Sequence, residues 1–238
     1  LQLNNEQHLS SSLSLIASAS NDSCVVIWNV SSKKKLRSLK DNSKCEITSL
    51  LQIDVNTLAS SSFWNIKIWD LTTFNEKFNL IGHSRDVTTI INVNCNLIAS
   101  SSLDGTIKIW DVDAKEEMFT IYGYKGVKCL ADIGKNRFAF AGDDNSVLFY
   151  NGIFKQEICV IKTIQTTITS MSVYNNEYII VSSITNEITL IDTNRYIITT
   201  KFTHNDNTNY NITCIMSLCK CSKLHLDDML FGTDDNRL

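Results

Sequence analysis

The chain repeats one short strand-like segment at a fixed interval. Ile27-Trp28-Asn29, Ile68-Trp69-Asp70 and Ile109-Trp110-Asp111 share the pattern Ile-Trp followed by Asn or Asp. Their tryptophans are 41 residues apart in both steps (69 − 28 and 110 − 69). A fixed period of about 20–50 residues is typical of repeat architectures, in which each unit buries its apolar faces against its neighbours. The period therefore predicts stacked repeats, and such arrays mostly present binding surfaces.

Two further rows of apolar residues follow the same period. One row opens β-like runs at Ile47, Val87, Val127, Ile168 and Ile212, and the other at Ile16, Leu58, Ile98, Phe138, Ile179 and Leu230. Steps of 40–42 residues dominate (for example 87 − 47 and 58 − 16), and the last step of 51 (230 − 179) indicates an insertion in the final repeat. The repeats thus continue past Trp110, with Phe149 and Ile191 in place of Trp.

The repeats fall at regular boundaries along the chain. We expect one domain over residues 1–238, divided roughly into 1–40, 41–81, 82–122, 123–162, 163–202 and 203–238.

The third repeat is predicted to contain four short strands. β-branched or alternating apolar residues run over 87–93, 97–102, 106–110 and 117–122. Asp104-Gly105 separates the second and third runs, and it predicts a hairpin because Gly accepts the positive φ of such a turn. No segment of ten or more residues has the 3.6-residue period of a helix. A two-sheet sandwich also uses short strands, but it does not explain the 41-residue register.

The third repeat resembles the WD-repeat family, whose units are the four-stranded blades of a β-propeller. Gly82-His83 precedes its first strand, Asp104 stands in the turn, and Trp110-Asp111 closes its third strand. The resemblance implies an all-β propeller of four-stranded antiparallel blades. It also implies a hydrogen-bonded network inside this blade, formed by His83, Ser100 or Ser102, Asp104 and Trp110.

Only the third repeat carries the whole motif. The first repeat lacks most of its first strand, and the sixth stops at Leu238 inside its third strand. We therefore expect about five to six blades in an incomplete ring, with unpaired strand edges that favour aggregation.

The composition argues against several classes of partner. A net charge of −3 and a sequence pI near 5.8 give no long-range attraction for nucleic acid or anionic lipid. No window approaches the ~18 apolar residues of a membrane helix, and no secretory signal opens the chain. The eight cysteines lie mostly in apolar runs, where a free thiol behaves as a small apolar side chain. We expect a cytoplasmic or nuclear protein without a nucleic-acid, membrane or obligate small-molecule partner.

Signals for catalysis, cofactors or metals are weak. His83 and Asp104 have the spacing of the structural network, and no nucleophile or phosphate-binding motif occurs, so no enzyme and no cofactor is expected. One weak zinc candidate remains, because thiolates and imidazole are zinc ligands. An extended hairpin loop is the favoured interpretation of this cluster, since its Cys-x-Cys spacing is tighter than usual for zinc. Its members are Cys214, Cys219, Cys221 and His225.

An aromatic pair marks the candidate protein-binding site. Phe63-Trp64 stands in the second repeat where Asp-Gly belongs, on the propeller face formed by the loops that enter each blade. Exposed Trp is enriched among residues that dominate binding energy. The alternative, that either ring folds inward to fill the space left by a missing His network, stays open. Neighbours predicted on the same face are Arg85, Asp86, Leu103, Lys128 and Asp143.

The sequence thus predicts a non-catalytic protein-interaction scaffold, whose rigid blades hold binding loops in place. One alternative is a substrate-recognition module of a ubiquitin ligase or other regulatory complex, with its effector domain outside this chain. Another is a propeller enzyme or small-ligand binder.

Overall fold

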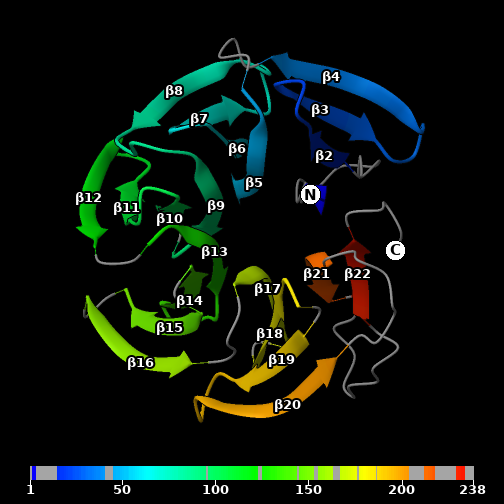
Figure 1. Ribbon diagram of the computed structural model, residues 1–238. Coiled ribbons are helices and arrows are strands. Elements are labelled where there is room, and N and C mark those ends of the chain that lie inside the picture. Colours follow the sequence, from blue (N-terminus) through cyan, green and yellow to red (C-terminus); the bar gives the residue numbers. More distant parts are fainter. Residues whose placement is uncertain are drawn as a thin grey trace. The chain divides into compact units, whose positions relative to one another are not determined.

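The computed structural model describes residues 2–3, 15–40, 45–94, 96–122, 125–143, 145–152, 155–162, 167–175, 177–185, 187–203, 212–217 and 229–233. These residues form five four-stranded antiparallel sheets and one two-stranded sheet (Figure 1). The predicted all-β class and four-stranded blades are confirmed. The chain divides into two compact units, Leu1–Gly123 and Tyr124–Leu238. A single domain over 1–238 and an incomplete ring stay predictions.

The first unit contains three sheets, which we call blades one, two and three. Within each blade, strands adjacent in sequence pair antiparallel. Blade one consists of β1 (Gln2–Leu3), β2 (Leu15–Ala19), β3 (Cys24–Asn29) and β4 (Lys34–Lys40). Blade two consists of β5 (Ile47–Asp54), β6 (Thr57–Ser62), β7 (Asn65–Asp70) and β8 (Glu76–Ile81). Blade three consists of β9 (Val87–Asn92), β10 (Leu97–Ser102), β11 (Ile107–Asp111) and β12 (Glu116–Ile121).

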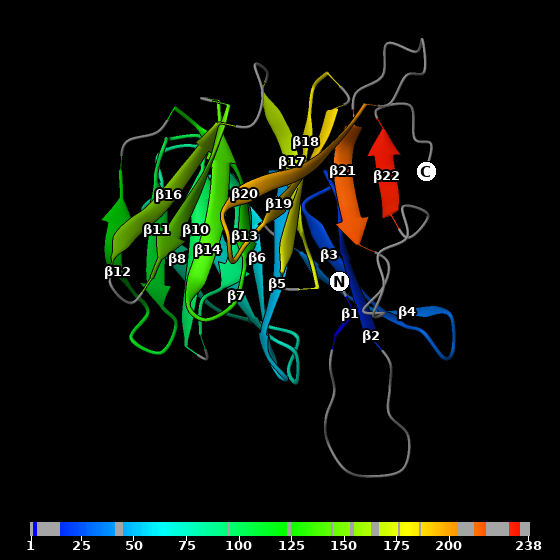
Figure 2. The same cartoon turned by 90° about the horizontal axis from the view of Figure 1, so that it is seen from below.

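The second unit contains blades four and five and the two-stranded sheet. Blade four consists of β13 (Val127–Asp132), β14 (Arg137–Gly142), β15 (Ser146–Asn151) and β16 (Gln156–Lys162). Blade five consists of β17 (Ile168–Tyr174), β18 (Tyr178–Ser183), β19 (Glu187–Asp192) and β20 (Ile197–Thr203). The last sheet pairs β21 (Ile212–Ser217) with β22 (Met229–Thr233). The sheets are twisted, so that β20 runs obliquely to β17 in the same blade (Figure 2).

The apolar core lies between consecutive blades of each unit. Because successive strand residues point to opposite faces, each blade can pack on two neighbours. Ala17, Val25 and Ile27 of blade one pack with Leu58 and Trp69 of blade two. The next interface of the first unit joins Ala59, Ile66, Ile68 and Leu80 of blade two to Ile98 and Trp110 of blade three. Each repeat therefore buries its apolar faces against a neighbour, as the period requires.

The Asp of the Trp-Asp pair closes the turn between the third and fourth strands. In blade two, Oδ1 of Asp70 accepts the N–H of Thr72 at 2.7 Å, and in blade three Oδ1 of Asp111 accepts the N–H of Ala114 at 2.8 Å. Asn29 and Asp192 make the same kind of bond in blades one and five. Short polar side chains that bind a following backbone N–H favour tight turns, so the repeated Asn or Asp shapes this turn.

The register corrects one position of the Trp row. Trp110 pairs with Ile98 across β10 and β11, and the corresponding pair in blade four is Phe138 with Tyr150. Tyr150 therefore replaces Trp in this blade, and the prediction of Phe149 is wrong. The two neighbouring aromatic residues point to opposite faces of β15, so a shift of one residue exchanges them. In blade five, Ile191 pairs with Ile179 and replaces Trp as predicted.

Candidate functional site

Blade three contains a buried polar network centred on His83. This residue lies between β8 and β9 and is only 5% exposed. Its Nδ1 lies 2.9 Å from Oδ2 of Asp104, and its Nε2 lies 2.8 Å from Oγ of Ser100. The indole N–H of Trp110 donates to the same Ser100 Oγ at 2.8 Å. The structure thus brings together His83, Ser100, Asp104 and Trp110, on the loop, second strand, turn and third strand of one blade.

The hydrogen-bond partners assign the protonation states of this network. A carboxylate only accepts hydrogen bonds, so Nδ1 of His83 carries a proton and Nε2 accepts from Ser100. Burial lowers the pKa of His83 against the opposing effect of Asp104, which keeps the ring neutral. Burial would raise the pKa of Asp104, but hydrogen bonds from Thr106, Ser84 and His83 lower it to about 2.

Ser102, the other serine named for this network, has a different position. Its Oγ donates to the carbonyl of Arg85 at 3.0 Å and accepts the N–H of Asp104 at 3.1 Å. It therefore connects the loop that enters blade three to the turn between β10 and β11.

The Ser100–His83–Asp104 arrangement has the order of groups found in hydrolase triads. Ser100 is 0% exposed, and its Oγ already accepts the indole N–H of Trp110. No substrate can reach a hydroxyl in this position, so the network can stabilise the blade but cannot present a nucleophile.

The aromatic pair of blade two lies at the surface. Phe63 and Trp64 are 41% and 45% exposed, with ring centroids 4.2 Å apart and planes tilted by 59°. They form a two-residue turn, because Ser62 and Asn65 pair directly on either side of them. Phe63 has a φ of 53°, a conformation that is unusual for a bulky side chain. Neither ring fills the blade interior.

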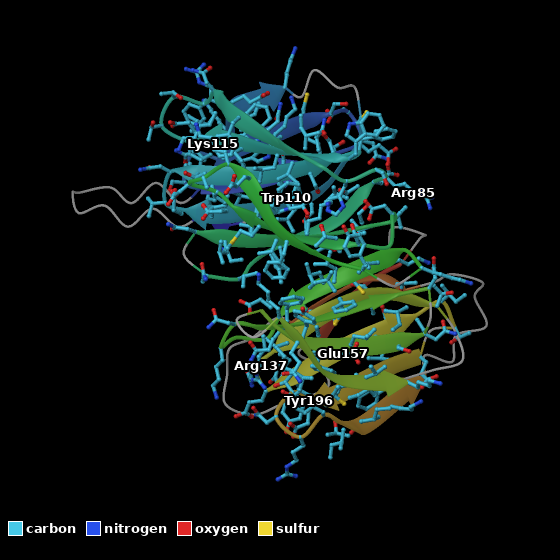
Figure 3. All side chains as sticks on the ribbon, turned by 90° about the vertical axis from the view of Figure 1, so that its left-hand side faces the viewer. Arg85, Trp110, Lys115, Arg137, Glu157 and Tyr196 are labelled. Atoms are coloured by element: carbon cyan, nitrogen blue, oxygen red, sulfur yellow. The ribbon has the colours of Figure 1, made fainter. Side chains whose placement is uncertain are left out.

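Three predicted neighbours lie beside this pair at the same end of the strands. The carbonyl of Phe63 accepts the N–H of Val87 in blade three at 2.6 Å. Asp86 precedes Val87, and its carbonyl accepts the N–H of Leu103 at 3.0 Å. Arg85 is exposed, and its Nη1 donates to the carbonyl of Leu103 at 3.2 Å. Figure 3 shows Arg85 at one end of this blade and Lys115 at the other.

Lys128 and Asp143 lie in the second unit, in blade four. Their side chains form an ion pair with 2.7 Å between Nζ and Oδ1, and both side chains are partly exposed. The predicted surface residues are therefore divided between the two units, and the set around Phe63 belongs to the first.

A row of hydroxyl pairs was not predicted. Each pair joins a Thr near the start of a first strand to a Ser on the second strand of the same blade. The Oγ1–Oγ distances are 2.8–2.9 Å, for Thr48–Ser61, Thr88–Ser101 and Thr169–Ser182. The sequence signal was the recurrence of Thr one residue after the apolar start of these strands, and Lys128 takes that position in blade four.

The four side chains of the weak zinc candidate all lie outside the described part of the chain, so the site stays a prediction. Cys219, Cys221 and His225 lie outside the described residues, as does the side chain of Cys214. The described residues contain no group of three or more His, Cys, Asp or Glu side chains that could hold a metal ion. Burial raises the pKa of Cys129 to about 12, so this thiol is not a reactive thiolate.

A cavity of about 410 Å³ lies in the first unit, bordered by residues of blades two and three. Its charged residues are Asp54, Lys77, Asp113 and Lys115, which together carry no net charge. Lys115 Nζ also lies 5.1 Å from the ring centroid of Phe78 on the cavity wall.

The comparisons with known proteins agree with the geometry of blade three. No helix among the described residues is long and apolar enough to cross a membrane. The comparison with curated proteins found no match. Residues 74–111 match the family model described as WD domain, G-beta repeat, and this segment includes the whole network from His83 to Trp110. The resemblance to the WD-repeat family is confirmed, and the segment 74–111 is a WD repeat.

Proposed function

We propose that this chain is a non-catalytic protein-interaction scaffold that binds a partner at the Phe63–Trp64 end of blades two and three. WD repeats generally form such scaffolds, and the matched segment contributes part of this surface. The buried position of the Ser100 hydroxyl supports a role without catalysis.

The exposure of Phe63 and Trp64 is the observation that carries the proposal. Both rings are more than two-fifths exposed at the tip of a short turn, where they contact each other. Burying such rings against a partner removes apolar surface from water at a cost of few rotatable bonds.

The surroundings of the pair fit a preorganised interface. Charged Arg85 and Asp86 border the aromatic tip, in the manner of a polar rim around an apolar centre. The bond between the Phe63 carbonyl and the Val87 N–H holds the tip in place before binding, which lowers the entropy lost on association. We propose that the Lys128–Asp143 pair, which lies in the second unit, makes a polar contact with a partner separate from the site around Phe63.

Substituting Trp64 tests the proposal. A partner is first isolated by affinity capture with the wild-type chain, and its Kd is then measured by calorimetry. Trp64→Ala should weaken binding on the order of 30-fold, since a central Trp contributes about 2 kcal/mol.

Met118→Ala is the control, because Met118 is an exposed apolar residue (49%) on β12, towards the end of blade three that lies opposite the proposed site. Its affinity should equal that of the wild type. Unchanged binding by Trp64→Ala, with wild-type melting behaviour, would overturn the proposal.

A further inference from the structure

The aromatic tip of blade two is held by a segment of blade three. The N–H of Val87 donates to the carbonyl of Phe63 at 2.6 Å, and the carbonyl of Val87 accepts the hydroxyl of Thr48 in blade two. Thr48 also contacts Ser61, next to the tip, at 2.9 Å. Val87 is therefore bound to blade two through both of its backbone polar groups.

The four residues before Val87 are each bound within blade three. Ser84 donates its N–H to Oδ2 of Asp104 at 2.9 Å, the same oxygen that His83 contacts. The carbonyl of Arg85 accepts from Ser102, and the carbonyl of Asp86 accepts from Leu103. An unbroken series of hydrogen bonds thus runs along residues 83–87, from the buried imidazole to the carbonyl of Phe63.

We infer that His83 is a positioning residue for the proposed partner site, acting through residues 83–87 on the Phe63–Trp64 turn. This inference rests on the proposed function of that turn. Phe63 keeps a positive φ, and a strained residue persists only where its surroundings determine its conformation. Members of a buried hydrogen-bond network reinforce one another. Removing His83 therefore loosens Asp104, then residues 84–87, and finally the hydrogen bond from the Val87 N–H to the Phe63 carbonyl.

Amide hydrogen exchange tests this coupling without any partner. In His83→Ala, exchange at the amide of Val87 should be about tenfold faster, the change expected when one net hydrogen bond is lost. Acrylamide quenching should rise in parallel, measured in a Trp28→Phe background so that Trp64 is the exposed indole of the first unit. Trp69 and Trp110 are only 2–3% exposed.

Two further variants separate the coupling from a general loss of stability. Ser102→Ala breaks the series at Arg85 but leaves the His83–Asp104 contact intact, so it should also speed exchange at Val87, and it serves if His83→Ala fails to fold. Lys108→Met removes a largely buried ion pair with Glu117 in the same blade and should leave exchange at Val87 unchanged.

The inference is overturned if Val87 keeps wild-type exchange while the Ser84 amide in His83→Ala, or the Asp104 amide in Ser102→Ala, exchanges faster. An equal rise at Val87 in Lys108→Met would also overturn it. Neither result depends on partner binding. Failure of the His83 inference is therefore distinguishable from failure of the proposed function, which would appear as unchanged partner binding by Trp64→Ala.

Discussion

Blades two and three have the same strands but use their second turn differently. Both contain a Trp whose indole N–H donates to a serine on the second strand, Trp69 to Ser60 and Trp110 to Ser100, each at 2.8 Å. In blade three the turn carries Asp104 and completes a buried network, whereas in blade two it exposes Phe63 and Trp64. The Trp–Ser bond and the packed strands therefore suffice for a blade, and a turn released from the network can present a surface.

Removing the shared tryptophans should have the largest effect. Trp69→Ala and Trp110→Ala should each lower the free energy of unfolding by about 3–5 kcal/mol, as is usual for a buried Trp. The loss should be greater for Trp110, since its removal also leaves Ser100 and His83 with fewer partners. Urea denaturation followed by circular dichroism measures both losses. If either chain fails to fold, the Phe variants should keep the same order, and equal losses would contradict the comparison.

His83→Ala should follow, with a loss of about 2–3 kcal/mol, because it leaves a cavity and removes one hydrogen-bond partner each from Asp104 and Ser100. Arg85→Ala, in the same loop but exposed, should change stability by no more than about 0.5 kcal/mol. Thermal and urea unfolding compare the two variants. A loss for His83→Ala as small as that for Arg85→Ala would mean that the network adds nothing to blade three.

Acid should weaken the first unit through the same network. The folded pKa of His83 lies below its ordinary 6.5, so the unfolded chain takes up a proton first and stability falls as the pH drops below about 6.5. Asp104 has a folded pKa of about 2 against an ordinary 3.8, so its contribution is lost as the pH falls from about 4 towards 2.

Matched variants identify these contributions in urea titrations at several pH values. His83→Gln should flatten the dependence between pH 7 and 5, and Asp104→Asn should flatten it below pH 4. The pH dependence of the free energy of unfolding in Asp104→Asn must be compared with that of the wild type. This is necessary because Asp70 of blade two also has a pKa of about 2, owing first to its hydrogen bond with Thr72. Identical slopes in variant and wild type would exclude a role for the network in acid unfolding.

The turn of blade two should give the smallest change and the opposite sign. Phe63→Gly removes the strain of a positive φ, and should leave the free energy of unfolding unchanged or raise it by up to about 1 kcal/mol. Trp64→Gly, at a neighbouring position without a positive φ, should lower it slightly. Calorimetric melting measures both changes. A marked loss for Phe63→Gly would show that the aromatic ring stabilises the fold.

Much of the architecture could be predicted because the repeat period acts at every level. Apolar starts such as Val87 and Ile98 recur with it, and they are the positions that pack between blades. The contacts from His83 to Trp110 were expected only through the resemblance, since residues far apart in sequence have no local pattern that shows they meet. The choice between Ser100 and Ser102 required the strand register, because these residues are two apart and point to the same side.

Other features had no usable sequence signal. Among the described residues, each turn between the third and fourth strands has a non-glycine residue with a φ of 51–61°, a conformation usually signalled by Gly or Asn. These residues are Lys33, Phe74, Lys115, Lys155 and Tyr196, three lysines and two aromatic residues, which are not the types that usually signal a positive φ. The wrong prediction of Phe149 has a similar origin. Phe149 and Tyr150 are adjacent aromatic residues, so either fits the apolar row in the sequence. Only the pairing of Phe138 with Tyr150 shows which residue takes the Trp position.

The bond between Val87 and Phe63 also has a consequence for folding order. In repeat proteins, stability is the sum of terms within repeats and terms between neighbours, and this bond belongs to the second kind. The four strands of blade two pair only with one another, but its aromatic tip reaches its final geometry only after the start of β9 has docked. A nascent or partly unfolded chain therefore lacks the finished tip, so the surface matures only when two successive repeats have assembled.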